Sequence, residues 1–137
     1  MLEISMIFTL LVLFQVKHFI CDYPLQTQYM LNKANATNWV KPLASHAFIH
    51  SSCTWIVLHL YGMLFSLDYS RYIFTIVALS LADFIIHFTV DRIKASPKLG
   101  GRWNPTQPYF WWALGADQMM HHLTHYIFIY VIIQSLK

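Results

Sequence analysis

Four long apolar stretches, separated by three polar connections, dominate the pattern of hydrophobic and polar residues along the chain. Each stretch is long enough to cross a bilayer, which takes about 20 residues at a helical rise of about 1.5 Å per residue. Prolines and glycines in the connections break helical hydrogen bonding. The pattern predicts an all-α, polytopic membrane protein with four transmembrane helices in one bundle and a single domain over residues 1–137. We expect the helices at about residues 2–21, 42–64, 72–91 and 109–135.

The composition strengthens the membrane interpretation. Hydrophobic residues make up 57% of the chain and charged residues 11%, whereas an ordinary soluble domain carries roughly 25% charged residues.

The first stretch has Glu3 where a signal peptide has basic residues, and no small-residue cleavage pattern precedes Cys21, so we expect a retained helix. Cys21 and Cys53 give no disulfide framework, and we expect buried thiols there rather than metal ligands.

Basic residues concentrate in two of the three connections, at residues 31–41 and 92–108. With four helices, these two connections lie on the same side of the membrane, opposite both termini. The positive-inside rule then places the basic connections in the cytoplasm and the termini outside. The net charge of +3 is small, and we expect no nucleic-acid partner.

Each apolar stretch also carries a stripe of His and Asp residues at a spacing of four. Residues four apart share one face of a helix, and all four stripes lie at similar depth near the basic connections. A single buried His or Asp is more often a satisfied packing group than a ligand, but aligned stripes on all four helices favour a metal site or a proton pathway. The stripes are His18 and Asp22; His46 and His50; Asp83, His87 and Asp91; and Asp117, His121 and His125.

Neutral imidazoles and carboxylates that converge between helices are typical ligands of zinc, manganese and iron. The four-helix di-iron proteins use Glu ligands with Glu-x-x-His spacing, whereas this chain has one Glu, outside the stripes. We therefore predict one or two divalent ions per chain, zinc ahead of manganese or iron, with the ten stripe residues as candidate ligands. Asp83 and His125 lie a turn deeper and are equally suited to supporting the ligands from behind. For His122, a ligand and a helix contact are equally good interpretations.

Four short stretches carry a resemblance to a known family. They are KHFICDYPLQTQYMLNK, LASHAFIH, IIHFTVDRIK and ADQMMHH, in this order over roughly residues 17–122. The chain resembles the bacterial and phage family of small membrane proteins catalogued as domain of unknown function 3307. Its pattern falls on His18, Asp22, Leu25 and Gln26, on Leu43 and His46, on His87, Asp91 and Lys94, and on Asp117, Gln118 and His121. The resemblance implies a bacterial inner-membrane location and supports the site without naming a reaction.

The leading functional hypothesis is an intramembrane metal-dependent hydrolase. A bound ion lowers the pKa of a water molecule and polarises an ester or phosphoryl oxygen. Asp22 or Asp91 would then act as general base, and Lys94 with Arg92 would receive an anionic group. The depth of the stripes predicts a lipid or lipid-linked, phosphate-bearing substrate at the cytoplasmic interface. By loose analogy, the stripes are similar to those of membrane-bound metal-dependent hydrolases thought to act on lipids.

Two other functions fit the same stripes. The first is binding or transport of a divalent metal ion or of protons, because His and Asp chains also mark ion pathways across membranes. The one-sided depth of the stripes counts against it, since only His59 is available near the opposite face. The second is a small membrane effector in which a metal ion only fixes the bundle. Four helices form a thin shell around a polar site, which also leaves room for a homodimer.

Overall fold

The computed structural model describes residues 2–136, and this part of the chain consists of helices and their connections, without a strand. The all-α prediction is therefore confirmed, and each of the four predicted stretches is a long helix. These long helices are α1 (Leu2–Asp22), α3 (Val40–Leu64), α4 (Tyr69–Ala95) and α5 (Pro108–Ser135). Three short elements lie in the connections: α2 (Gln28–Leu31), η1 (Asn32–Ala34) and η2 (Gly100–Arg102).

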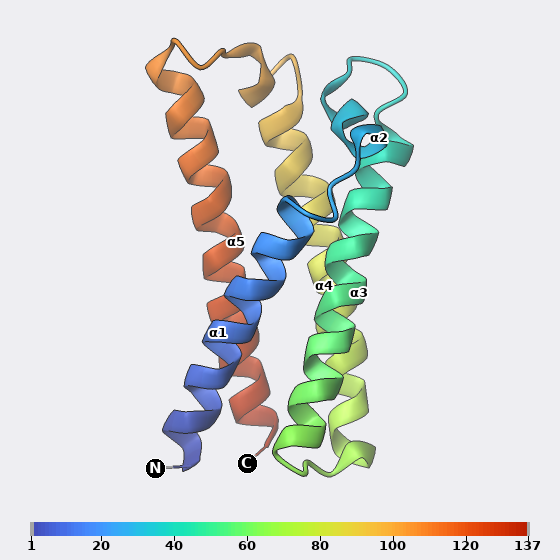
Figure 1. Ribbon diagram of the computed structural model, residues 1–137, viewed down its shortest axis with the longest axis vertical. Helices are drawn as coiled ribbons and strands as arrows, with labels where there is room; N and C mark the ends of the chain where they lie inside the picture. The colour runs from blue at the N-terminus through green and yellow to red at the C-terminus, as the bar shows by residue number, and fades with distance from the viewer. Residues whose placement is uncertain (1, 137) are drawn as a thin grey trace.

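The long helices alternate in direction along the bundle (Figure 1). Helix α1 packs against α3 and α5, and α4 packs against the same two helices from the other side. The start of α1, the end of α5 and the turn between α3 and α4 lie at one end, which we call the terminal end. Helix α2 and the connection that precedes α5 lie at the other, which we call the basic end because these connections carry the basic residues.

Helix α4 begins at Tyr69, earlier than predicted, because Asp68 caps it. The Asp68 carboxylate accepts hydrogen bonds from the Ser70 hydroxyl at 2.7 Å and from the Ser70 backbone N–H at 3.0 Å. These hydrogen bonds hold the pKa of the exposed Asp68 side chain below its ordinary value. Such a cap supplies a partner for a backbone donor that has none inside the helix.

Three of the long helices are long and apolar enough to cross a membrane: Leu2–Asp22, Val40–Leu64 and Tyr69–Arg102, the last of which continues through the turn after α4. The prediction of four such segments is corrected at residues 109–135. That stretch is a helix, α5, but it is not among the candidate spans found within residues 2–136. Its hydropathy falls because Asp117, Gln118 and three histidines lie inside it.

An apolar core fills the terminal end of the bundle. In a bilayer, van der Waals packing between helices rather than exclusion of water holds such a core together. Every long helix contributes to it, so the four helices are held to one another independently of the polar residues at the other end. The buried members are Leu10, Phe14, Leu58, Tyr61, Tyr72, Ile76, Leu79, Phe128, Ile129, Ile132 and Ile133.

At the basic end, the connection after α4 folds back onto the helix. A Cβ atom at Gly100 would lie 2.6 Å from the backbone oxygen of Lys94, so only glycine allows this close approach. Arg92 fastens α4 to the first connection, because its guanidinium donates to the Lys33 carbonyl at 3.0 Å and lies 3.8 Å from the centre of the Trp39 ring. Arg92, which the sequence suggested as an anion-binding residue, is thus engaged in holding α4 to the first connection.

Candidate metal centre

The His and Asp stripes of all four long helices meet inside the half of the bundle near the basic end. His46 on α3 lies at the middle, with its Nε2 3.1 Å from Asp91 Oδ2 on α4 and 3.4 Å from Asp22 Oδ1 on α1. His121 on α5 completes the set, with its Nε2 3.1 Å from Asp91 Oδ1. The spacing of four places each stripe on one helix face, and the packing of the helices turns those faces toward one another.

One group of donor atoms surrounds the Asp22 carboxylate. Its Oδ1 lies 3.1 Å from His50 Nε2, and its Oδ2 lies 3.1 Å from His18 Nε2. The donor atoms of Asp22, His46 and His50 all lie within 4.8 Å of one another, and so do those of His18, His50 and His87. A single ion at either position could therefore be reached by three side chains.

A second group surrounds the Asp91 and Asp117 carboxylates. His121 Nε2 lies 3.5 Å from Asp117 Oδ1, and the donor atoms of Asp91, Asp117 and His121 lie within 4.8 Å of one another. Because His46 contacts both Asp22 and Asp91, the two groups are directly linked. The arrangement offers either two neighbouring metal positions or one position with additional polar groups around it.

Several ring nitrogens in this region are buried without a hydrogen bond to the described part of the chain, among them Nε2 of His18, His46 and His87. His46 Nε2 lies close to two carboxylate oxygens, yet neither contact has hydrogen-bond geometry. Metal–ligand bonds of about 2.1 Å place neighbouring ligands about 3.0 to 3.4 Å apart. Two of the nitrogen–oxygen contacts, His50 Nε2 to Asp22 Oδ1 and His121 Nε2 to Asp91 Oδ1, are hydrogen bonds of 3.1 Å. At the other nitrogens, a shared ion would satisfy donor atoms that are otherwise costly to bury.

Asp83 and His125 lie outside these groups of donors. The Asp83 carboxylate accepts from Lys17 Nζ at 2.7 Å and from the Thr54 hydroxyl at 2.9 Å, and the Asp83 backbone carbonyl accepts from His87 Nδ1 at 3.0 Å. This hydrogen bond leaves Nε2 as the nitrogen that His87 can offer to a metal ion. A backbone carbonyl that accepts from a histidine commonly fixes the ring orientation of a metal ligand.

His125 stacks on Phe14 of the apolar core, with ring centroids 4.9 Å apart. His122, next to His121 in sequence, faces the outer edge of the cluster, where its Nδ1 lies 2.9 Å from the Gln15 amide nitrogen. Cys21 and Cys53 are free thiols, buried and half-buried, and neither belongs to a group of metal donors among residues 2–136. Eight of the ten predicted ligands are therefore brought together: His18, Asp22, His46, His50, His87, Asp91, Asp117 and His121.

Two buried lysines were not predicted from the sequence to contact the site. Lys33, from the first connection, places its Nζ 2.6 Å from Asp91 Oδ2, and Lys17 forms the buried ion pair with Asp83. The position of Lys17 within an apolar stretch does indicate a buried ion pair, because a lysine within a membrane-spanning segment requires a carboxylate partner. Which carboxylate it meets depends on helix packing, since Asp83 lies 66 residues away in sequence.

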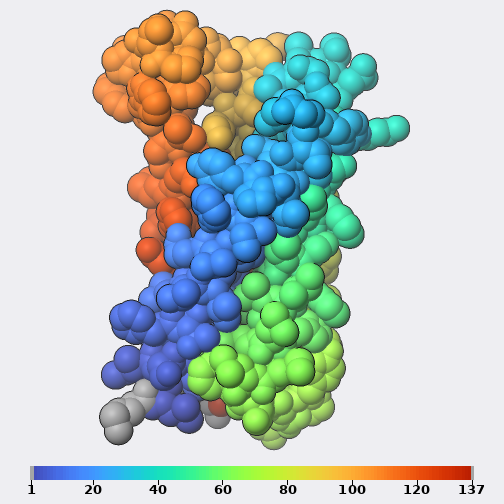
Figure 2. Space-filling view, in the orientation of Figure 1, coloured from blue at the N-terminus to red at the C-terminus, as the bar shows by residue number. Residues whose placement is uncertain are grey.

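A polar cavity of about 170 Å³ reaches from the carboxylates toward the basic end. Asp22, Asp91 and Asp117 lie on its inner side, and Lys33, Lys94, Gln26 and Gln118 also line it. Lys94 Nζ lies 3.3 Å from Asp117 Oδ2, and its side chain is 36% exposed, the most of the three lysines paired with interior carboxylates. In the space-filling view, the surface is hollowed at the basic end between the start of α5 and the segment around α2 (Figure 2).

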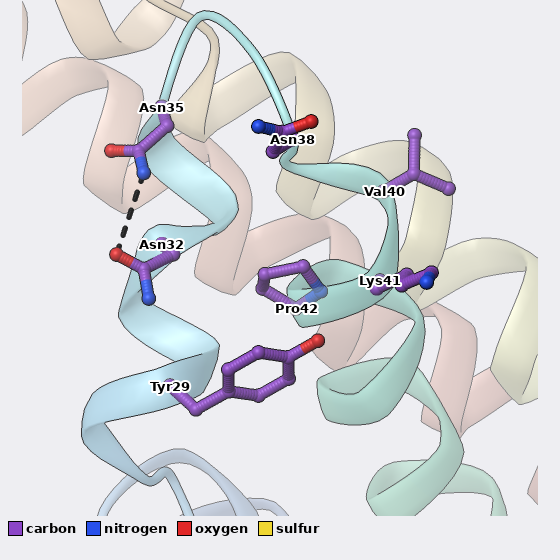
Figure 3. Close-up of a pocket in the computed structure, with 7 residues that line it drawn as sticks. All are labelled: Tyr29, Asn32, Asn35, Asn38, Val40, Lys41 and Pro42. Carbon is purple, nitrogen blue, oxygen red and sulfur yellow. Dashed lines mark hydrogen bonds between the residues drawn. The ribbon is translucent and has the colours of Figure 1, made fainter.

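Another cavity, of about 690 Å³, lies between the first connection and the start of α3 (Figure 3). Its lining residues include Tyr29, Asn32, Asn35, Lys41 and Pro42. Within this lining, the Asn35 amide donates a hydrogen bond of 3.4 Å to the Asn32 side-chain oxygen. None of the histidines or aspartates of the cluster lines it. Size alone therefore does not identify the functional site of this protein.

Comparison with known proteins identifies a family but no characterised relative. No curated protein and no solved structure gives a significant match to the chain. One family matches residues 10–137, a range that contains all the candidate ligands and every helix described above except the first residues of α1. The chain belongs to this family, described as protein of unknown function (DUF3307).

Proposed function

We propose that the chain is an intramembrane metal-dependent hydrolase that acts on a lipid or lipid-linked substrate at the basic end of the bundle. The observation that carries the proposal is the convergence of eight His and Asp side chains beside a polar cavity, with buried ring nitrogens that lack hydrogen bonds within residues 2–136. Burial of so many polar groups opposes folding in a membrane, so a functional role is the better explanation.

The cofactor we propose is one or two divalent ions, zinc ahead of manganese or iron. Asp22, His46 and His50 would hold one ion, and Asp91, Asp117 and His121 a second. The contacts of His46 with both carboxylates suit neighbouring sites that share ligands. His18 and His87 form with His50 an alternative position for the first ion, and the Asp83 backbone carbonyl orients His87.

Asp22 is better placed than Asp91 to act as general base, through the carboxylate oxygen that does not hold the ion, because its side chain is 21% exposed and that of Asp91 is 7% exposed. The carboxylate would take a proton from water while the water oxygen bonds to the phosphorus or acyl carbon of the substrate. The ester bond to the leaving alkoxide then breaks, and the alkoxide receives the proton that the carboxylate took from water. Ester and water thus give acid and alcohol, and a bound ion stabilises the charge that develops on the ester oxygen.

The lipid assignment depends on how the bundle lies in the membrane, and we propose that α5 crosses it with the other three helices. Its polar residues Asp117, His121 and His125 are buried, while Tyr126, Ile127 and Tyr130 lie on its exposed face. A helix whose polar groups face the bundle can span a bilayer despite a lower mean hydropathy. The basic connections would then face the cytoplasm of a bacterial inner membrane.

Transport of metal ions or protons is the second candidate, and the Lys17–Asp83 pair favours it by extending the polar stripes deeper into the bundle. On the side of this pair that faces the terminal end, Phe14, Leu79 and Phe128 belong to the apolar core. A transport route would have to cross this layer, whereas a hydrolase needs access from the basic end alone.

Hydrolysis can be tested with the full chain in nanodiscs that contain phosphatidic acid and phosphatidylglycerol. Samples loaded with zinc or manganese are compared with chelated samples, and phosphorus NMR follows the lipids. We expect metal-dependent conversion of at least one lipid, lost in Asp22→Asn and kept in Asp68→Asn, which changes the exposed carboxylate at the terminal end. Unchanged lipids together with zinc uptake into sealed vesicles would overturn the hydrolase and support transport.

A further inference from the structure

We propose that the groove between α4 and α5 binds the hydrocarbon chain of an anionic phospholipid, while Lys94 and the polar cavity receive its phosphate. This inference rests on the proposed function, because it names the substrate class and the binding path of the same site. The groove has a volume of about 230 Å³ and is walled by Val90 and Ile93 on α4 and by Ala113, Ala116 and Met120 on α5.

The groove suits a hydrocarbon chain because its walls are apolar and face outward from the bundle. Ile93 and Met120 are exposed at its sides, where a bilayer would surround them. The small side chains of Ala113 and Ala116, with Gly100 of the third connection, leave the space between the two helices open. A water-soluble substrate would gain nothing from such a surface, whereas a lipid can enter it sideways from the membrane.

The groove and the polar cavity meet at one pair of residues. Lys94 and Asp117 line both spaces, and their Nζ to Oδ2 distance is 3.3 Å. A lipid in the groove would therefore place its polar end beside Lys94 and next to the Asp91 and Asp117 donors. Gln26 and Gln118 line the same cavity and offer amide N–H groups to phosphate oxygens.

The charges inside the bundle favour an anionic head group over a neutral one. Four interior carboxylates, Asp22, Asp83, Asp91 and Asp117, lie close to three lysines, Lys17, Lys33 and Lys94. If the histidines are neutral, these seven side chains together carry one net negative charge. Binding of one divalent ion would change the net charge of the site to +1, and binding of two ions would change it to +3. An uncompensated charge is costly within a membrane, and a phosphate group would offset it.

The inference can be tested with the full chain in detergent by native mass spectrometry, using dioleoyl phosphatidic acid, dioleoylglycerol and glycerol phosphate as probes in zinc-loaded and chelated samples. We expect the zinc-loaded protein to retain phosphatidic acid about tenfold better than dioleoylglycerol. Ala116→Phe fills the groove and should abolish the retention of phosphatidic acid, and Lys94→Gln should reduce this retention about tenfold. Ile127→Phe adds the same bulk to the exposed face of α5 and should leave it unchanged.

Equal retention of both lipids, or full retention by Ala116→Phe with its fold intact by circular dichroism, would overturn the inference. Displacement of phosphatidic acid by glycerol phosphate at equal concentration would do the same, because it would show that the hydrocarbon chain contributes nothing. The milder Ala116→Val keeps the test valid if the phenylalanine variant does not fold. Selective lipid retention without hydrolysis would support this inference and contradict the proposed function. Hydrolysis of a soluble phosphate ester without lipid retention would support a hydrolase and contradict this inference.

Discussion

The two halves of the bundle are built from different residues. At the terminal end, leucine, isoleucine and aromatic side chains from all four long helices pack into one apolar core. Toward the basic end, the same four helices bury histidines, aspartates and Lys17, and the first connection adds Lys33. Packing at the terminal end holds the helices together, so the costly polar groups at the other end are not needed for that purpose. This difference supports the proposal that the polar half has a chemical role.

The boundary between the halves is sharp. His125 stacks on Phe14, and one layer nearer the basic end Lys17, Asp83 and Thr54 form a buried polar cluster. This cluster contacts the histidines at two points, since Asp83 Oδ1 lies 3.2 Å from His87 Nδ1 and Lys17 Nζ lies 3.4 Å from His50 Nδ1. It therefore forms the floor of the candidate metal centre.

The largest expected effect comes from breaking this floor. Lys17→Met should lower the free energy of unfolding by about 3 to 5 kcal/mol, because Asp83 would stay buried without its cation. The double variant Lys17→Met, Asp83→Leu should recover most of the loss, since it removes both charges. Unfolding in detergent followed by circular dichroism measures both. A single variant as stable as the wild type would show that the pair is not a structural unit of the polar half.

A large but purely structural effect is expected in the apolar half. Leu58→Ala should lower the free energy of unfolding by about 2 to 4 kcal/mol, because it leaves a cavity in a fully buried position. Metal content per folded molecule should not change, since Leu58 lies in the apolar core rather than among the donors. Elemental analysis of the folded fraction tests this. Loss of metal together with stability would mean that the two halves are not independent.

Histidines in the two halves should respond differently to the same substitution. His121→Ala should weaken zinc binding about 100-fold, roughly 2.7 kcal/mol, because it removes one donor from the second group. His59→Ala is the matched control: His59 is hydrogen-bonded to the Tyr69 hydroxyl, at 2.8 Å, near the terminal end. Competition with a chelator of known affinity measures both. Equal losses would indicate nonspecific binding of metal by surface histidines.

The smallest effect is expected from two tyrosines in the apolar core. The hydroxyls of Tyr61 and Tyr72 are buried without a hydrogen bond to any residue in 2–136. Tyr61→Phe and Tyr72→Phe should therefore be neutral or raise the free energy of unfolding by up to about 1 kcal/mol. The same unfolding measurement applies. A clear loss of stability in either variant would show that the apolar half contains a functional polar contact.

The sequence was sufficient to predict the four helices and the convergence of their stripes. The spacing of four placed His18 with Asp22, and His87 with Asp91, on one face each, and helix geometry alone supports that step. The sequence could not predict that His46 lies between Asp22 and Asp91, because this depends on how α1, α3 and α4 pack. The prediction of a fourth spanning segment at residues 109–135 was wrong by hydropathy, because α5 carries polar residues that lie buried against the bundle.

Contacts from the connections were the hardest part to predict. Lys33 reaches Asp91 across 58 residues of sequence, and nothing in the local pattern around Lys33 indicates that its amine is buried. The position of Asp83 was left open between ligand and support, and its contacts with Lys17 and Thr54 depend on the depth at which the helices meet. Local periodicity defines faces, and tertiary packing decides which atoms on them touch.

The most direct test of a metal centre in the polar half is the metal content of the purified full chain, without an affinity tag that binds metal. Elemental mass spectrometry would compare the wild type with the double variant Asp22→Asn, Asp91→Asn and with Asp68→Asn as control. We predict one or two equivalents of zinc, manganese or iron in the wild type and the control, and loss in the double variant. No metal in any sample after incubation with each ion, or equal metal in all three, would contradict the account.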